Sequence, residues 1–164
     1  MVALTCASAM TRESNLHDLA HRPGFLLRKA HQVAVAIFHD EIGELELTPP
    51  QHNVLAAILA HPGSHQVEIS RRVGYDRATV GALLVNLEAR KLISRRSSST
   101  DRRIRTLHIT AEGKRLMSAS TPAMVRINRQ ILEPLASHER ELFVFLLAKI
   151  AFSRADREAP EGNA

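Results

Sequence analysis

Apolar side chains recur at helical spacing near the start of the chain. From Pro23 onwards the gaps between them are mostly one, three or four residues, which keeps them on one face of a helix. These apolar positions are 26, 30, 33, 34, 37, 38, 42 and 45. The pattern predicts one long amphipathic helix.

A second helix has a well-marked start at Thr48. The Thr48 hydroxyl can cap the helix, Pro49 takes the first helical position, where no N–H is needed, and Gln51 stands three residues after the cap. The sequence HPG at 61–63 ends the helix. We expect its buried stripe to consist of Val54, Leu55, Ile58 and Leu59.

Two shorter helices follow, separated by a glycine. The third helix covers about residues 65–73, with apolar Val67, Ile69 and Val73, and Gly74 breaks it. Asp76 is a good cap for a fourth helix. In that helix apolar residues fall at i, i+3, i+4 and i+7, namely Val80, Leu83, Leu84 and Leu87.

The period then changes from helical to alternating. Residues 92–97 and 104–110 are short and rich in β-formers, with Leu107 and Ile109 alternating with polar neighbours. The segment SSSTDR between them has the composition of a turn. The pair is therefore predicted to form a β-hairpin.

Two further helices complete the pattern. Thr110 can cap the fifth, with Glu112 in its first turn, and the helix runs towards Glu133 with an expected kink at Pro122. Ser137 starts the sixth, whose LFVFLLAKIAF segment is apolar around too much of its circumference for a lone surface helix. The fold class is thus mainly α with one small β-hairpin.

Composition narrows the class of protein. A chain of 164 residues with 45% apolar and 24% charged residues has room for one globular core. No apolar run approaches the roughly 20 residues needed to cross a bilayer, so we expect a cytoplasmic protein without membrane contact. The single cysteine, Cys6, excludes an intramolecular disulfide framework and fits a reducing compartment.

Positive charge is concentrated in one segment. Residues 71–105 carry ten basic side chains against three acidic ones, whereas the formal net charge of the whole chain is only +5. Clustering of this kind indicates a polyanionic partner.

The basic segment includes a helix-turn-helix pattern. Ile69 and Val73 anchor the first helix, Gly74 permits the turn, and Val80 and Leu83 bury the second helix. The opposite face of the second helix would meet bases or phosphates in the DNA major groove. That face carries Tyr75, Arg77, Ala78, Thr79 and Ala82.

At this point the chain resembles a known family. The sequences LTPPQHNVLAAI, VEISRRVGYDRATVGALLVNLEARKLISRR and DRRIRTLHITAEGKRL are similar to the multiple-antibiotic-resistance regulator (MarR) family of bacterial winged-helix repressors, over residues 25 to 150. The resemblance implies a homodimer with intertwined helices and two winged helix-turn-helix lobes on a pseudo-palindromic DNA operator. It also implies a ligand, often an aromatic acid or phenol, that lowers DNA affinity.

The resemblance also suggests how the chain is organised. We expect a flexible leader at 1–21, a dimerisation region at 22–47 and 111–154, a DNA-binding lobe at 48–110 and a disordered tail at 155–164. The apolar faces of the first and sixth helices exceed what a small lobe could cover, which favours a dimer.

The hairpin tip then has an assigned role. The resemblance places Arg103 in the DNA minor groove, where the potential is strongly negative. A free guanidinium would lose about 2 kcal/mol of rotamer freedom on docking, and Asp101 can hold it in place beforehand. The remaining cations, Arg95, Arg96, Arg102 and Arg105, would bind phosphates, with Ser98 among the hydroxyl donors. A surface ion pair of little consequence is the alternative.

A ligand site is expected on the first helix. Arg28, His31 and Gln32 lie three and four residues apart in an otherwise apolar helix, and Phe25 and Phe38 add aromatic surface. An aromatic carboxylate could pair with the guanidinium, and His52 could face the same cavity. Arg28 could instead pair with a glutamate across the dimer.

The sequence gives less support to an enzyme or to a metal-binding protein. We see no nucleophile motif, phosphate-binding glycine loop or suitably spaced carboxylate pair, and expect neither an enzyme nor a cofactor. The histidine pairs 17/21 and 61/65 are spaced by four, but the first lies in the leader and the second spans Pro62–Gly63. A metal- or thiol-responsive regulator, and a DNA-binding module without a ligand, remain alternatives.

Overall fold

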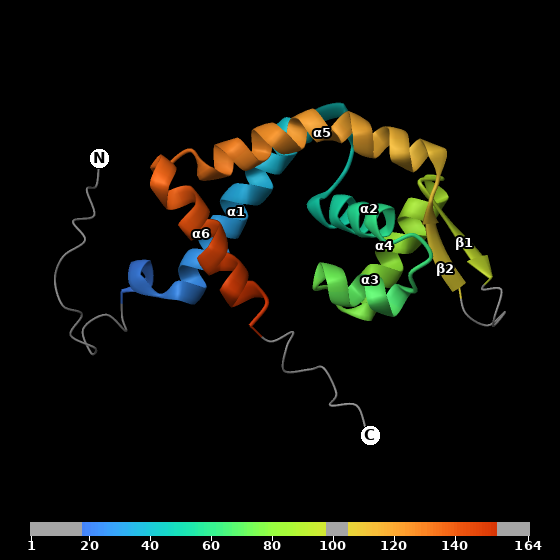
Figure 1. The fold of residues 1–164 in the computed structure, drawn as a ribbon, viewed down its shortest axis with the longest axis horizontal. Coiled ribbons are helices and arrows are strands. Elements are labelled where there is room, and N and C mark those ends of the chain that lie inside the picture. The colour runs from blue at the N-terminus through green and yellow to red at the C-terminus, as the bar shows by residue number, and fades with distance from the viewer. Residues whose placement is uncertain (1–17, 98–104, 154–164) are drawn as a thin grey trace, which may run out of the picture.

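The helices of the chain form an arch with a winged-helix lobe beneath one end (Figure 1). The computed structural model describes residues 18–97 and 105–153. Its α-helices and β-strands in chain order are α1 (Pro23–Ile42), α2 (Pro49–Ala60), α3 (Gln66–Val73), α4 (Arg77–Ala89), β1 (Ile93–Ser97), β2 (Arg105–Ile109), α5 (Ala111–Leu132) and α6 (Ser137–Ala151). Two short 3-10 helices, Leu19–His21 and Gly43–Leu45, flank α1. Within the described ranges, no helix is both long and apolar enough to cross a membrane.

The helix boundaries follow local chemistry. Thr48 and Gln51 form a reciprocal capping box at the start of α2, and Asp76 and Thr110 each accept a backbone N–H at the starts of α4 and α5. Gly74 has φ +73°, a left-handed conformation that costs glycine nothing, and it ends α3. These boundaries confirm the predicted helices two to five.

The core of the lobe lies where α2, α3, α4 and the hairpin meet. Its largest fully buried side chains are aliphatic and come from every one of these elements. Burying each such side chain contributes about 1.5–3 kcal/mol relative to leaving it in water. They are Val54, Leu55, Ile58, Ile69, Val80, Leu84, Leu87 and Leu107.

One predicted core residue lies outside this core. Leu59 is 40% exposed, so its assignment to the buried stripe of α2 was wrong. The physical reason is angular: at about 100° per residue, Leu59 lies about 140° around the helix from Val54, at the edge of the stripe and in the last turn. Val67, likewise off the stripe defined by Ile69 and Val73, is also 40% exposed, and Ser70 takes the inward position.

The fifth helix joins the lobe to the rest of the molecule. α5 continues as a single helix through Pro122 and packs along α1. Glu41 of α1 accepts hydrogen bonds from Arg126 (2.5 Å) and Gln130 of α5. The Arg126 hydrogen bond is the main reason that the pKa of Glu41 is lowered, because it favours the charged carboxylate.

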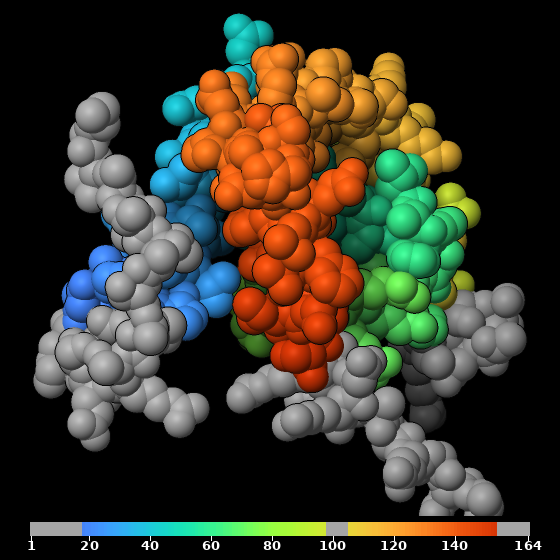
Figure 2. Space-filling view, turned by 60° about the vertical axis from the view of Figure 1, so that its left-hand side comes forward, coloured from blue at the N-terminus to red at the C-terminus, as the bar shows by residue number. Residues whose placement is uncertain are grey.

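The sixth helix is barely covered by the rest of the chain. None of its residues is buried, and Leu142, Val144 and Phe145 are 55%, 52% and 58% exposed. Figure 2 shows α6 as a ridge on the surface between α1 and the helices of the lobe. The molecule therefore presents a large apolar surface to solvent.

Candidate nucleic-acid interface

The fourth helix presents a polar and small-residue face to solvent. Val80, Leu84 and Leu87 hold one side of α4 in the core. The predicted contact residues Arg77, Ala78, Thr79 and Ala82 are all exposed on the other side. Tyr75, just before the helix, is half-buried and packs against the core, so only part of its ring is available to a partner.

The start of α4 is held rigidly. Asp76 Oδ1 accepts the Thr79 backbone N–H at 2.9 Å, and Oδ2 accepts the Thr79 hydroxyl at 2.6 Å. These two hydrogen bonds, with the hydroxyl bond the larger cause, lower the pKa of Asp76. The carboxylate thus fixes both the first turn and the Thr79 side chain.

A second contact fixes α4 relative to α3. The Gln66 side-chain amide donates to the Arg77 carbonyl at 2.8 Å. A Cβ at Gly81 would lie 3.2 Å from the same amide nitrogen, which is tighter than usual for such contacts. The two helices of the helix-turn-helix are therefore closely joined at the end that carries the exposed residues.

The hairpin extends from the C-terminal end of α4. β1 and β2 pair antiparallel, with Ile93 opposite Ile109 and Ser97 opposite Arg105. A Cβ at Gly113 would overlap the Leu92 carbonyl oxygen, so glycine at this position allows α5 to begin tightly against the hairpin.

The strand arginines differ in what they contact. Arg96 and Arg105 are exposed, and Arg105 donates to the Ser97 hydroxyl at 3.2 Å. Arg95 is half-buried, with its Nε 3.0 Å from Glu88 Oε2 of α4, a charge contact that is not aligned as a hydrogen bond. Arg95 therefore ties the hairpin to α4, a role that the sequence did not reveal. The other predicted tip residues, Ser98, Asp101, Arg102 and Arg103, lie outside the described residues, as does Cys6.

The predicted ligand residues fall into two separate groups. Phe38 of α1 and His52 of α2 are buried together, with ring centroids 6.0 Å apart in an edge-to-face arrangement. Arg28, His31 and Gln32 are exposed on the N-terminal half of α1, and Arg28 lies over the half-buried Phe25 ring at 5.3 Å. At 1.5 Å per residue, Arg28 lies about 15 Å along the helix from Phe38.

The buried histidine has a partner that sequence reasoning missed. Ser120 of α5 is fully buried, its hydroxyl donates to the Met117 carbonyl at 2.8 Å, and it lies 3.4 Å from His52 Nε2. Burial lowers the pKa of His52, because the charged imidazolium is poorly solvated there. A single serine in a helix gives no sequence signal for such a contact. Within residues 18–97 and 105–153, no group of three or more potential metal-ligating side chains comes together.

Comparison with known proteins identifies the lobe. The model of the MarR family matches residues 45–104, which hold α2, α3, α4, the first strand and the segment after it. The transcriptional repressor NicR of Pseudomonas putida KT2440 is 30% identical over 146 residues, covering 89% of this chain and 92% of NicR. The chain belongs to the MarR family.

Solved structures of MarR-family relatives agree with this fold. BpsR of Bordetella bronchiseptica, whose DNA binding is regulated by 6-hydroxynicotinic acid, is 33% identical with a TM-score of 0.73, over 78% of this chain and 97% of BpsR. The repressor CouR, bound to a 23-mer DNA duplex, is 29% identical with a TM-score of 0.77, over 88% of this chain and 99% of CouR.

Family membership confirms two predictions from the sequence. The chain has the winged helix-turn-helix fold, and it is a DNA-binding transcriptional regulator of the MarR family. In a helix-turn-helix the second helix is the one that enters the DNA major groove, and in this chain the second helix is α4.

Proposed function

We propose that this MarR-family regulator is a homodimeric repressor released from its operator by a small aromatic carboxylate or phenol. The observation that carries the proposal is the exposed N-terminal face of α4 beside a basic hairpin, in a chain 30% identical to the repressor NicR. BpsR, whose DNA binding is regulated by 6-hydroxynicotinic acid, supports the class of ligand. Such a regulator acts on bacterial DNA in the cytoplasm.

The dimer is supported by uncovered apolar surface. On α1, Leu26, Leu27 and Val33 are 48%, 40% and 55% exposed, and α6 exposes a similar row. Contiguous apolar surface of this kind usually marks an interface. A second copy of the chain would cover both helices and place two lobes on adjacent half-sites, about 34 Å apart along the duplex.

In the lobe, Arg77 and Thr79 would contact the major groove together with the small residues Ala78 and Ala82. Arg96 and Arg105 would contact phosphates, and Arg103, with Asp101, would enter the minor groove. Tyr75 and Arg95 would support these contacts from half-buried positions.

The ligand residues would be completed by the partner subunit. Arg28, His31 and Gln32 are exposed on the part of α1 that the proposed dimer covers, and a carboxylate there could pair with the guanidinium. Phe25 beneath Arg28 would pack against an aromatic ring. Phe38 and His52 lie at the junction of α1, α2 and α5. There they would transmit the effect of ligand binding from α1 to the lobe.

Release of DNA by the ligand is the test. A labelled duplex from the region upstream of the gene is bound by the protein, and 6-hydroxynicotinate or 4-hydroxybenzoate is then titrated in while fluorescence anisotropy is followed. We expect at least about tenfold weaker DNA binding at saturating ligand, equivalent to about 1.4 kcal/mol of coupling.

The uncharged amides of the same acids serve as matched ligands, and they should leave DNA bound. The Arg28→Ala variant should bind DNA normally but respond to the acids much less. Unchanged DNA affinity with every acid tested would contradict a ligand-released repressor and favour a DNA-binding module without a ligand.

A further inference from the structure

The segment that leads into α3 pairs with the second strand of the hairpin. The Gly63 N–H donates to the Leu107 carbonyl at 2.9 Å, and the Leu107 N–H donates to the Ser64 carbonyl at 3.0 Å. This segment therefore lies alongside β2 as a further hydrogen-bonded edge. The start of α3 is thereby held next to the hairpin.

His65 adds a side-chain contact nearer the tip of the hairpin. Its Nδ1 lies 3.3 Å from the Arg105 carbonyl oxygen. A carbonyl can only accept a hydrogen bond, so Nδ1 carries the proton and donates. Arg105 is the first described residue after 98–104, the segment that contains Arg103. His65 thus holds the end of β2 that adjoins the tip segment.

Gln66, the next residue along the chain, makes the corresponding contact with α4. Its side-chain amide donates to the Arg77 carbonyl at 2.8 Å, in the first turn of that helix. The exposed polar residues Arg77 and Thr79 both belong to this turn. Two adjacent, half-buried side chains therefore contact the two surfaces that are proposed to bind DNA.

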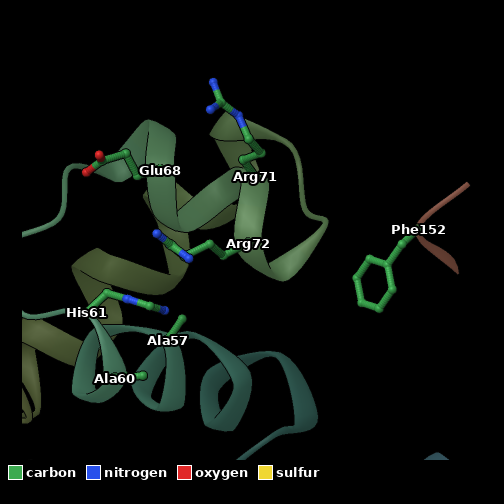
Figure 3. Close-up of a pocket in the computed structure, with 7 residues that line it drawn as sticks. All are labelled: Ala57, Ala60, His61, Glu68, Arg71, Arg72 and Phe152. Atoms are coloured by element: carbon green, nitrogen blue, oxygen red, sulfur yellow. The ribbon is translucent and has the colours of Figure 1, made fainter. Parts of the chain in front are cut away.

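The two ends of α3 have different surroundings. The last turn, which carries Arg71 and Arg72, borders the cavity of about 590 Å³ drawn in Figure 3. The start of the helix instead contacts the hairpin and α4, through His65 and Gln66. Glu68 Oε2 accepts the His65 backbone N–H at 2.7 Å and so fixes this start. The hairpin and α4 are thus joined through one short, fixed segment.

We propose that His65 and Gln66 are positioning residues, which set the spacing between the major-groove and minor-groove contacts of a lobe. His65 fixes the hairpin for the minor groove, and Gln66 fixes the first turn of α4 for the major groove. Both act through backbone carbonyls of DNA-binding residues and not through DNA itself. A site whose supporting contacts leave it about 1 Å too loose loses its specific interactions. The proposal rests on the groove contacts proposed above.

Methylation protection tests the two roles separately. Dimethyl sulfate attacks guanine N7, which faces the major groove, and adenine N3, which faces the minor groove. Labelled duplex from the region upstream of the gene is saturated with the wild type or a variant and then probed. The wild type should protect bases in both grooves. We expect His65→Ala to lose the protection of adenine N3 and keep that of guanine N7.

Gln66→Met should give the reverse pattern, because methionine keeps the length of the side chain but has no donor. Both variants should bind the upstream duplex at least about fivefold more weakly than the wild type, as followed by anisotropy. On an unrelated duplex of equal length the change should stay within about twofold, because non-specific binding depends on phosphate contacts.

Three further variants serve as controls. His65→Asn should keep the wild-type pattern, because the asparagine amide offers a donor close to the position of Nδ1. Val67→Ala, at an exposed neighbouring position, should change neither groove. A Cβ at Gly81 would lie 3.2 Å from the Gln66 amide nitrogen, so Gly81→Ala should displace the amide and act like Gln66→Met. Added to Gln66→Ala, it should have little further effect. Melting temperatures establish that each variant is folded.

The possible failures can be told apart. A wild type that protects neither groove would overturn the proposed groove contacts and this proposal together. Variants that protect both grooves as the wild type does would overturn the positioning roles alone. So would a loss of both protections at once in every variant, or a loss of affinity shared equally by the upstream and unrelated duplexes. The last result would show that these side chains contact phosphates directly.

Discussion

At the scale of single residues, a few polar side chains determine where the helices begin. Thr48, Asp76 and Thr110 each accept a backbone N–H three residues on, and each could be found from the sequence because capping depends only on near neighbours. Asp76 matters most for function, since it fixes the turn that carries Arg77 and Thr79.

Removing the Asp76 cap should weaken the fold in a pH-dependent way. The pKa of Asp76 is lowered in the folded protein, so its stabilisation is present above the unfolded pKa of about 3.9 and is lost as the pH falls through the folded value. We expect Asp76→Ala to lower the melting temperature by a few degrees at pH 7 and by much less at pH 3, as followed by circular dichroism.

Asp76→Asn is the matched control, because asparagine caps helices about as well as aspartate but does not titrate here. It should melt close to the wild type at pH 7. If Asp76→Ala melted like the wild type at pH 7, the cap would not stabilise α4.

Other single residues could not be predicted, because their environment is set by distant parts of the chain. Lys91 adopts φ +59° in the turn between α4 and the hairpin, where a glycine would have signalled the turn. Arg95 is predicted to bind DNA phosphates, and its contact with Glu88 left no signal in the sequence. Leu59 is as apolar as a core residue, but it lies in the last turn of α2 at the edge of the buried face and is partly exposed.

At the scale of elements, the helix-turn-helix is connected to the end of α1 by one arginine. Arg90 follows α4 and donates to the Glu46 carbonyl at 2.8 Å and to the Leu45 carbonyl at 3.5 Å. Both carbonyls lie between α1 and α2, more than 40 residues earlier in the chain. The end of α4 is thereby held against the segment that follows α1.

Loss of this connection should destabilise the lobe. We expect Arg90→Ala to lower the free energy of unfolding by about 1–2 kcal/mol in urea denaturation, because a charged donor and two carbonyls lose their partner. Arg90→Lys should recover only part of the loss, since one ammonium cannot span both carbonyls as a guanidinium does.

The exposed Lys114→Ala is the control and should stay within about 0.5 kcal/mol of the wild type. An Arg90→Ala protein as stable as this control would show that the two hydrogen bonds contribute nothing to the lobe.

Most elements were predictable because periodicity is local. The change from a helical to an alternating pattern located the hairpin, and the start of every helix from α2 to α6 lies within about two residues of its expected position. The burial of the strand side chains was less predictable, because exposure along β1 rises from buried Ile93 to exposed Ser97 and does not alternate from residue to residue.

At the scale of the whole molecule, the described part of the chain leaves a large apolar surface uncovered. Its apolar α6 and the N-terminal half of α1 have little to pack against, while the lobe has a closed core of its own. The spacing of apolar residues along the first and sixth helices predicted this apolar excess. It could not show that Arg28 and His52 lie far apart in one chain, nor that residues 61, 72 and 152 line one cavity, since both depend on how the helices pack.

The central claim is that the face of α4 and the basic hairpin bind duplex DNA, and one titration tests it most directly. Labelled duplex from the upstream region is titrated at low salt with the wild type, Arg77→Ala, Arg103→Ala and, as a control on α6, Lys149→Ala, and anisotropy is recorded. The account predicts a specific complex that both arginine variants weaken at least about tenfold and that Lys149→Ala leaves unchanged. A wild-type protein that ignores the duplex, or an Arg77→Ala variant that binds it as well as the wild type, would contradict the account.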